Sequence, residues 1–385
     1  MMVERPQYLA KITRSLRKVP VTALLGPRQC GKTTLARQVA SQHASEFFDL
    51  EDPIDQARLQ NPSRTLGRLK GLVVLDEIQL LPDLLPILRV LSDRRPLPCR
   101  FLILGSASLE LVNKSSESLA GRVRFVDVSG FSLSEVGTRK QDRLWLRGGF
   151  PDSFLARHES DSWKWRENFI RTFLQRDLPQ WGSQVPAAQV RRFWTMLAHV
   201  HGGLWNASEI GGSLGVSPPT SRRYLDLLTG SFMVRQLQPW FENLGKRLVI
   251  SPKVYLRDSG ILHALLQIPE QRILESHPKY GSSWEGFAIE QLLQQHGEGD
   301  AYFWATHSGA ELDLVLLRKG KRWGFEFKSG DAPTASKSMH IALEDLGLEH
   351  LYVVYPGEQA YSLDEKITCL GLADALKLKL YATEA

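Results

Sequence analysis

Cysteine is scarce in this chain, and long apolar runs are missing. Three cysteines among 385 residues, Cys30, Cys99 and Cys369, lie far apart without histidine or cysteine neighbours at metal-ligand spacing, which excludes a disulfide framework and a zinc site. No apolar run approaches the length that spans a bilayer, and charges from Glu4 and Arg5 onward leave no signal-peptide core. We therefore expect a cytoplasmic protein with no membrane partner.

The composition is that of a globular protein. Hydrophobic residues make up 43% and charged residues 23%. The chain is longer than one hydrophobic core supports, so two or three domains are expected. The net charge of +6 says little by itself, but the stretch from Val185 to Gly260 holds nine basic side chains against four acids, an excess of +5. This excess favours a surface for a nucleic acid or an acidic partner.

A glycine-rich motif follows the first apolar run. Val21 to Leu25 predicts a buried strand and Thr34 to Ala40 a helix, the context that a phosphate-binding loop requires. Such a loop wraps phosphates with backbone N–H groups, while its lysine reaches the β- and γ-phosphates and its threonine ligates Mg²⁺. We predict a nucleoside triphosphate site here, the alternative being an ordinary strand–turn–helix. Its residues are Gly26, Pro27, Arg28, Gln29, Cys30, Gly31, Lys32, Thr33 and Thr34.

Two later apolar runs end in polar residues. One ends in Asp76 and Glu77, and the next, Phe101 to Leu104, is followed by Ser106 and Ser108. An acid at this position is expected to hold Mg²⁺, which is the role predicted for Asp76. Glu77 is the predicted general base for the attacking water, and either serine can bind the γ-phosphate or that water. A surface acidic pair and a polar turn remain the alternatives.

Arg122 is the candidate cation for the charge that develops on the γ-phosphate during hydrolysis. Arg124 follows two positions later, so a solvated strand edge is an equal alternative. A catalytic arginine supplied by a neighbouring chain would require a homo-oligomer.

Taken together, these motifs resemble a family of bacterial and archaeal AAA-type ATPases joined to a C-terminal domain long catalogued as of unknown function. The resemblance implies ATP as the nucleotide, an open αβα parallel sheet, and Asp76 and Glu77 in the Mg²⁺ and water-activating roles. It covers nearly the whole chain. The motifs are Arg5-Pro6-x-Tyr8, the phosphate loop, Leu75-Asp76-Glu77-Ile78-Gln79, Gly105-Ser106-x-Ser108, Leu119-Ala120-Gly121-Arg122 and Gly148-Gly149-Phe150-Pro151.

Ala207 to Leu228 predicts a helix-turn-helix. Gly215 lies in the tight turn, and Ser217 can cap a second helix. Phe232 to Trp240 is expected to form a two-stranded wing. In a winged helix, the side chains of Thr220, Arg222 and Arg223 would face a nucleic-acid groove or phosphates, with DNA favoured. The alternative is a lid over the nucleotide or an interdomain joint.

The C-terminal part carries a second chemical pattern. A strand from Glu311 contains Asp313, a turn follows, and the returning strand places Glu326 and Lys328 on one face. With Glu285 on a preceding helix, this resembles a restriction-endonuclease-like nuclease core. The resemblance implies Asp313 and Glu326 as Mg²⁺ ligands, Lys328 as catalytic and Glu285 as a supporting acid. A buried salt-bridge cluster without catalysis is the alternative.

These patterns predict an α/β protein of three parts. A P-loop AAA-type ATPase domain occupies residues 1–139, a helical and winged-helix domain 140–267, and a small restriction-endonuclease-like α/β domain 268–385. The leading hypothesis is an ATP- and Mg²⁺-dependent ATPase whose nucleotide state controls a C-terminal half that binds nucleic acid or cleaves it with Mg²⁺. The alternative is a nucleotide-gated protein-interaction module with an inactive nuclease-like domain.

Overall fold

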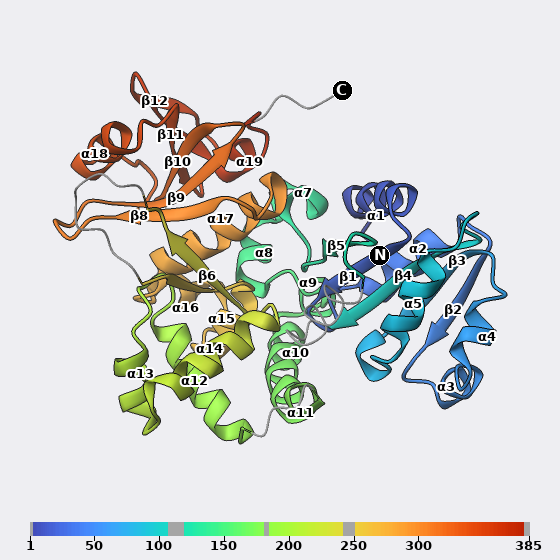
Figure 1. Ribbon diagram of the computed structural model, residues 1–385. Helices are drawn as coiled ribbons and strands as arrows, with labels where there is room; N and C mark the ends of the chain where they lie inside the picture. The colour runs from blue at the N-terminus through green and yellow to red at the C-terminus, as the bar shows by residue number, and fades with distance from the viewer. Residues whose placement is uncertain (1–2, 107–118, 181–184, 242–250, 381–385) are drawn as a thin grey trace. The chain divides into compact units, whose positions relative to one another are not determined.

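The computed structural model describes residues 3–106, 119–180, 185–241 and 251–380 (Figure 1). The chain divides into two compact units. The first contains the residues up to Gly130 together with Gly230–Phe232, and the second contains Phe131–Thr229 and the residues from Met233 onward.

The first unit is built on a five-stranded parallel sheet in the order β2-β3-β4-β1-β5. The apolar runs of the sequence form its central strands, so β1, β3 and β4 are almost completely buried. The strands are β1 Val21–Gly26, β2 Ser45–Asp49, β3 Gly71–Asp76, β4 Cys99–Ser106 and β5 Val123–Asp127. The helices are α1 Pro6–Lys18, α2 Lys32–Ala40, α3 Pro53–Arg58, α4 Pro62–Leu66, the 3₁₀ turn η1 Ile78–Leu80 and α5 Leu84–Ser92.

Helices cover both faces of this sheet. Ala23 of β1 belongs to a core that includes Leu85 and Leu88 of α5. The next residue position of β1 points the other way, because side chains alternate along a strand. Thr22 accordingly shares a buried hydrogen bond of 2.9 Å with Ser15 of α1. The αβα parallel sheet predicted for this part of the chain is therefore confirmed.

The second unit begins with helices. They are α7 Leu133–Val136, η2 Thr138–Lys140, α8 Gln141–Arg147, α9 Pro151–Leu155, α10 Glu159–Thr172, the π-helical turn η3 Phe173–Asp177, α11 Leu178–Gln180, α12 Ala187–His199, α13 Ala207–Leu214 and α14 Pro218–Gly230. The predicted helix-turn-helix elements are present as α13 and α14. Gly215 adopts φ 69° between them, and Asn206 caps α13 through its side chain.

An eight-stranded mixed sheet completes the second unit, in the order β12-β13-β11-β10-β9-β8-β6-β7. Its strands are β6 Val234–Pro239, β7 Lys253–Leu256, β8 Ala301–Ala305, β9 Glu311–Arg318, β10 Lys321–Phe327, β11 His350–Tyr355, β12 Tyr361–Asp364 and β13 Ile367–Gly371. Its helices are α15 Ser259–Leu265, α16 Gln271–Ser276, α17 Tyr280–His296, α18 Lys337–Leu346 and α19 Leu372–Ala375.

The strands after the helix-turn-helix differ from expectation. Phe232 to Trp240 holds one strand, β6, not a two-stranded wing, and its antiparallel partner β7 begins at Lys253. On its other edge β6 pairs with β8, where Gln238 is opposite Tyr302. The sheet is therefore continuous across the expected boundary near residue 267. The pairing joins strands far apart in sequence, which local composition does not encode.

Candidate functional site

The phosphate loop connects the end of β1 to the start of α2. Gly26 has no room for a side chain, because a Cβ there would lie 2.0 Å from the backbone oxygen of Val128. Gln29 and Gly31 both adopt positive φ, at 62° and 97°. Glycine takes such angles at little cost. The helix α2 then begins at Lys32, and Thr34 is an exposed residue of its first turn.

Lys32 is buried inside this loop. Its side-chain ammonium donates hydrogen bonds to the carbonyl oxygens of Gly26 and Pro27, at 2.9 and 2.8 Å. Both acceptors are neutral carbonyls that precede the helix. The lysine predicted to reach phosphates is thus held by the loop that would surround them.

Thr33 and Asp76 meet at the carboxyl edge of the sheet. The Thr33 hydroxyl donates to a carboxylate oxygen of Asp76 at 2.7 Å. Their elements come together because β1, β4 and β3 are parallel neighbours whose carboxyl ends lie at the same edge. Burial raises the pKa of Asp76, and the Thr33 hydrogen bond opposes that rise. Two oxygen donors of the kind that Mg²⁺ prefers therefore lie together, as the sequence predicts.

Glu77 is held by two neighbouring polar side chains. Gln79 donates from its amide to a carboxylate oxygen of Glu77 and also to the Ser106 hydroxyl oxygen, the latter at 2.9 Å. Ser106 in turn donates to the same oxygen of Glu77 at 3.2 Å. Glu77 itself takes a left-handed backbone conformation with φ 56°. Gln79 was not among the predicted site residues, although it lies in the motif Leu75-Asp76-Glu77-Ile78-Gln79. Ser108, which was predicted, lies outside the described residues.

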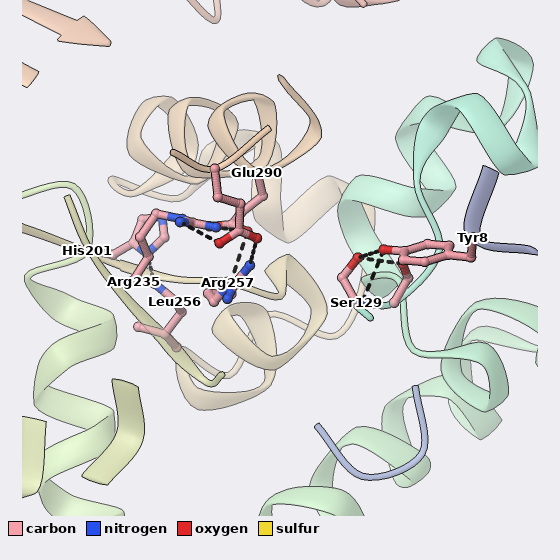
Figure 2. Close-up of polar contacts among 9 residues, drawn as sticks. Tyr8, Ser129, His201, Arg235, Leu256, Arg257 and Glu290 are labelled. Carbon is pink, nitrogen blue, oxygen red and sulfur yellow. Dashed lines mark hydrogen bonds and ion pairs between the residues drawn. The ribbon is translucent and has the colours of Figure 1, made fainter. Parts of the chain in front are cut away.

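Arg5 holds the phosphate loop in place through hydrogen bonds to backbone carbonyls. Its guanidinium donates to the carbonyls of Cys30, Ser129 and Gly130, at 3.1, 3.0 and 3.0 Å. Tyr8 shares a hydrogen bond of 2.9 Å with the Ser129 hydroxyl (Figure 2). These two residues therefore tie the phosphate loop to the segment after β5. Their contacts, 25 to 125 positions away along the chain, are what sequence reasoning missed.

Other residues of the predicted loop have structural contacts. The Cys30 side chain is completely buried, with its sulfur 3.4 Å from the Val128 carbonyl oxygen. Arg28 lies 3.1 Å from Glu51, an ion pair at the protein surface. An exposed pair of this kind contributes little to stability.

Arg122 does not lie at this site in its own chain. It precedes β5, and its carbonyl accepts a hydrogen bond from the amide of Val21 at the start of β1. The phosphate loop follows the other end of that six-residue strand. Asp93 also holds the Arg122 guanidinium through two hydrogen bonds of 2.7 and 3.0 Å. The structure therefore corrects the expectation that Arg122 acts on a γ-phosphate bound in its own chain.

The second cluster forms as the sequence predicts around the hairpin of β9 and β10. Asp313 accepts a hydrogen bond of 3.0 Å from the backbone amide of Phe327 on the opposite strand. Lys328 donates to Glu326 at 2.7 Å. Lys319 and Gly320 make the tight turn with φ of 49° and 75°. The hairpin thus brings Asp313, Glu326 and Lys328 to one place.

Two residues of β7 join this cluster without having been predicted. The Lys253 ammonium lies 3.3 Å from an oxygen of Asp313 and 3.5 Å from an oxygen of Glu285. Tyr255 donates a hydrogen bond of 2.5 Å to that same Glu285 oxygen. Lys253 and Tyr255 are two positions apart on one strand and so face the same side. The acids predicted around a metal therefore surround a lysine as well.

Electrostatics in this cluster favour added positive charge. Burial and then the charge of Asp313 raise the pKa of Glu285 to about 8. The same two causes raise the pKa of Glu326 to about 7. One oxygen of Glu326 is buried and accepts no hydrogen bond from the described residues. Carboxylates in this state suit a divalent cation, although no three acids, cysteines or histidines of the described chain converge as a ready-made metal site.

Some of the basic side chains between Val185 and Gly260 form ion pairs with buried acids and do not lie on the surface. Arg235 and Arg257 both bind the buried carboxylate of Glu290, as Figure 2 shows, and both also contact Glu298. With Lys253, three of the nine basic residues are therefore in buried ion pairs. Lys246 and Arg247 lie outside the described residues. The remaining four, Arg191, Arg192, Arg222 and Arg223, are exposed on α12 and α14.

Comparison with known proteins identifies the chain's relatives. A family model described as an AAA domain matches residues 18–137. Two models described as domains of unknown function, DUF8612 and DUF4143, match residues 138–272 and 280–375. An uncharacterized protein of Mycobacterium tuberculosis is 50% identical over 370 residues, covering 96% of this chain and 84% of that protein. A protein of Mycobacterium bovis matches to the same extent.

The chain belongs to the family of these mycobacterial proteins. Its first unit holds an AAA-type P-loop ATPase domain. Among solved structures, a Walker-type ATPase of Pyrococcus abyssi is similar with a TM-score of 0.49 and 16% identity, covering 69% of this chain and 96% of that one. The RuvB Holliday junction branch migration motor of Thermotoga maritima has a TM-score of 0.30 and 16% identity, covering 61% and 90%. No helix of the described residues is long and apolar enough to cross a membrane.

Proposed function

We propose that this family member hydrolyses ATP with Mg²⁺ and that its nucleotide state controls a nucleic-acid-binding second unit with Mg²⁺-dependent nuclease chemistry. DNA is the favoured nucleic acid. The hydrogen bond between Thr33 and Asp76, at 2.7 Å, carries the nucleotide half of the proposal, because it assembles both oxygen donors beside the phosphate loop.

In the nucleotide site each residue has a separate task. Lys32 would exchange the two loop carbonyls for β- and γ-phosphate oxygens, and Thr33 and Asp76 would hold Mg²⁺. When bound, the metal neutralises charge on the phosphates. Glu77 would take the proton of the attacking water. Gln79 and Ser106 would position the Glu77 carboxylate. Both donate to the same oxygen of Glu77, which leaves its other oxygen for the water.

The acid cluster of the second unit supports the nuclease part. Asp313 and Glu326 would hold the divalent ion, and the buried Glu326 oxygen without a hydrogen bond is the observation that fits it. When bound, the metal polarises the scissile phosphate. Lys328 would orient the attacking water or stabilise the charge of the transition state, and Glu285 would support the ligands from α17.

The helix-turn-helix elements supply the proposed nucleic-acid surface. Arg222 and Arg223 are exposed on α14, and Thr220 stands in its first turn. Arginines on such a helix bind phosphates or base edges in a groove. The rival function is a nucleotide-gated protein-interaction module with an inert second unit. The ion pairs of Lys253 favour it, because they satisfy two of the acids without a metal.

DNA affinity at low salt separates the two functions. The proposal predicts binding by the full chain that weakens steeply as salt rises, because phosphate contacts release counterions. The affinity should also differ between the ATP-bound and nucleotide-free protein. If no DNA binds at low salt, with or without ATP, the nucleic-acid half fails and the interaction module remains.

A further inference from the structure

Lys253 is a buried cation in the acid cluster. Only 7% of its side chain is exposed, and its ammonium lies 3.3 Å from Asp313 and 3.5 Å from Glu285. The ring centre of Phe303, at 5.7 Å, borders it on another side. The side chain is thus an ammonium ion whose two carboxylate partners lie within ion-pair distance.

The partners of Lys253 are otherwise fixed in place. The second carboxylate oxygen of Asp313 accepts from the Phe327 amide, and Glu285 accepts from Tyr255. Strand β7 thus supplies both the charge and the hydroxyl that hold these acids. Lys253 takes the Asp313 oxygen that is not bound to the backbone, which is the one best placed for another cation.

We propose that Lys253 is an internal counter-ion that competes with a divalent metal ion for Asp313, while its second partner, Glu285, is the supporting acid. The inference rests on the metal site of the proposed function. An ammonium ion beside a carboxylate repels a divalent cation on the same group, so Lys253 lowers the affinity of Asp313 for a metal ion.

Lys328 provides an internal comparison. Its side chain is 43% exposed, and its ammonium is paired with Glu326 at 2.7 Å. It lies after the end of β10 and can turn toward solvent, as long charged side chains do. Lys253 is enclosed by the protein and has no such freedom. Removing the charge at position 253 should therefore change metal affinity more than removing it at position 328.

The test is a calorimetric titration of the full-length, nucleotide-free protein with Mn²⁺ alone. Lys253→Gln keeps a hydrogen-bond donor without the charge and should bind Mn²⁺ about tenfold more tightly than the wild type, or better. Lys253→Arg keeps the charge and should show no gain. Lys328→Gln should gain less than Lys253→Gln. Asp313→Ala measures binding elsewhere in the chain, including the site beside Thr33.

The outcomes separate this inference from the proposed function. If Lys253→Gln binds Mn²⁺ no more tightly than a wild type that does bind it, the competition is refuted and the metal site stands. If neither protein binds Mn²⁺ above the level of Asp313→Ala, the metal site itself is refuted. Thermal melting checks the fold of each variant. Should Lys253→Gln melt early, Lys253→Met, which keeps the apolar stem, is titrated against the same two criteria.

Discussion

Thr33 donates a hydrogen bond to Asp76 across 2.7 Å, although β4 lies between the strands that lead to them. The contact shows that the end of the phosphate loop and the end of β3 form one site. Burial raises the pKa of Asp76, while Thr33 and the charge of Lys32 oppose that rise. The three side chains thus form a connected set at the carboxyl edge of the sheet.

Lys32→Ala is expected to abolish ATP binding. Its ammonium is the side-chain charge that a phosphate loop directs at the β- and γ-phosphates, and charge-assisted hydrogen bonds are the strong ones. We expect affinity for ATP to fall about a hundredfold or more, measured by isothermal titration. Lys70→Ala, at an exposed lysine of the same unit, is the control and should bind like the wild type. Tight binding by Lys32→Ala would remove the basis of the nucleotide assignment.

Gln79→Leu should slow ATP hydrolysis without weakening ATP binding. Gln79 touches Glu77 and Ser106 and acts through the base, so kcat should fall about tenfold with KM unchanged. Glu77→Gln, which removes the base itself, should lower kcat about a hundredfold or more while ATP still binds. Steady-state phosphate release measures both. If turnover is unchanged in Glu77→Gln, another residue is the general base. If KM rises in Gln79→Leu, Gln79 contributes to ATP binding.

The double variant Arg222→Ala/Arg223→Ala should weaken DNA binding at all sequences. Each phosphate contact contributes about one unit to the slope of log affinity against log salt, so the slope should fall by about two. Fluorescence anisotropy at several salt concentrations measures it. Lys377→Ala removes an exposed lysine of the same unit and should leave the slope unchanged. If the double variant has the same salt slope as the wild type, the alternative function of α14, as a lid over the nucleotide or an interdomain joint, is favoured.

Glu298 should stabilise the second unit in a pH-dependent way. Burial would raise its pKa, but Arg257 and Arg235 together lower it from 4.5 to about 2. A lowered acid pKa means that the stabilisation is present above pH 4.5 and is lost as pH falls from 4.5 to 2. The urea midpoint of Glu298→Gln should therefore lie below that of the wild type at pH 7, and the gap should narrow by pH 3. A gap that is constant with pH would show that the ion pairs do not set this stability.

The nucleotide site was the most predictable part of the molecule. Its residues follow directly after apolar strands, and parallel strands bring such ends to one edge, so Thr33 and Asp76 could be matched from sequence alone. Asp313 and Glu326 were predictable for a similar reason, because a short hairpin fixes their register. The position of Arg122 could not be predicted, because chain order does not show whether a residue lies at the end of the sheet that carries the phosphate loop or at the opposite end.

The remaining features depend on contacts that sequence spacing does not encode. Lys253 lies 60 positions before Asp313, and the pairings of β7 with β6 and of β6 with β8 bring it to the cluster. Arg5 reaches a carbonyl 125 positions away. The basic excess was visible, but its division between buried ion pairs and exposed arginines depends on which helix and strand faces turn inward. Charge counts therefore overstated the surface available for nucleic acid.

Cleavage of DNA by the full chain is the decisive measurement for the proposed nucleotide-controlled nuclease. Single- and double-stranded DNA are incubated with Mg²⁺ or Mn²⁺, with and without ATP, and products are resolved on a denaturing gel. We expect metal-dependent cleavage whose rate changes with ATP and which is lost in Asp313→Ala and Lys328→Ala. The control is Lys321→Ala, at an exposed lysine that begins β10, and this variant should cleave DNA like the wild type. If the wild type cleaves no DNA under any of these conditions, or if cleavage survives both substitutions, the cluster of Asp313 and Lys328 is not a nuclease site.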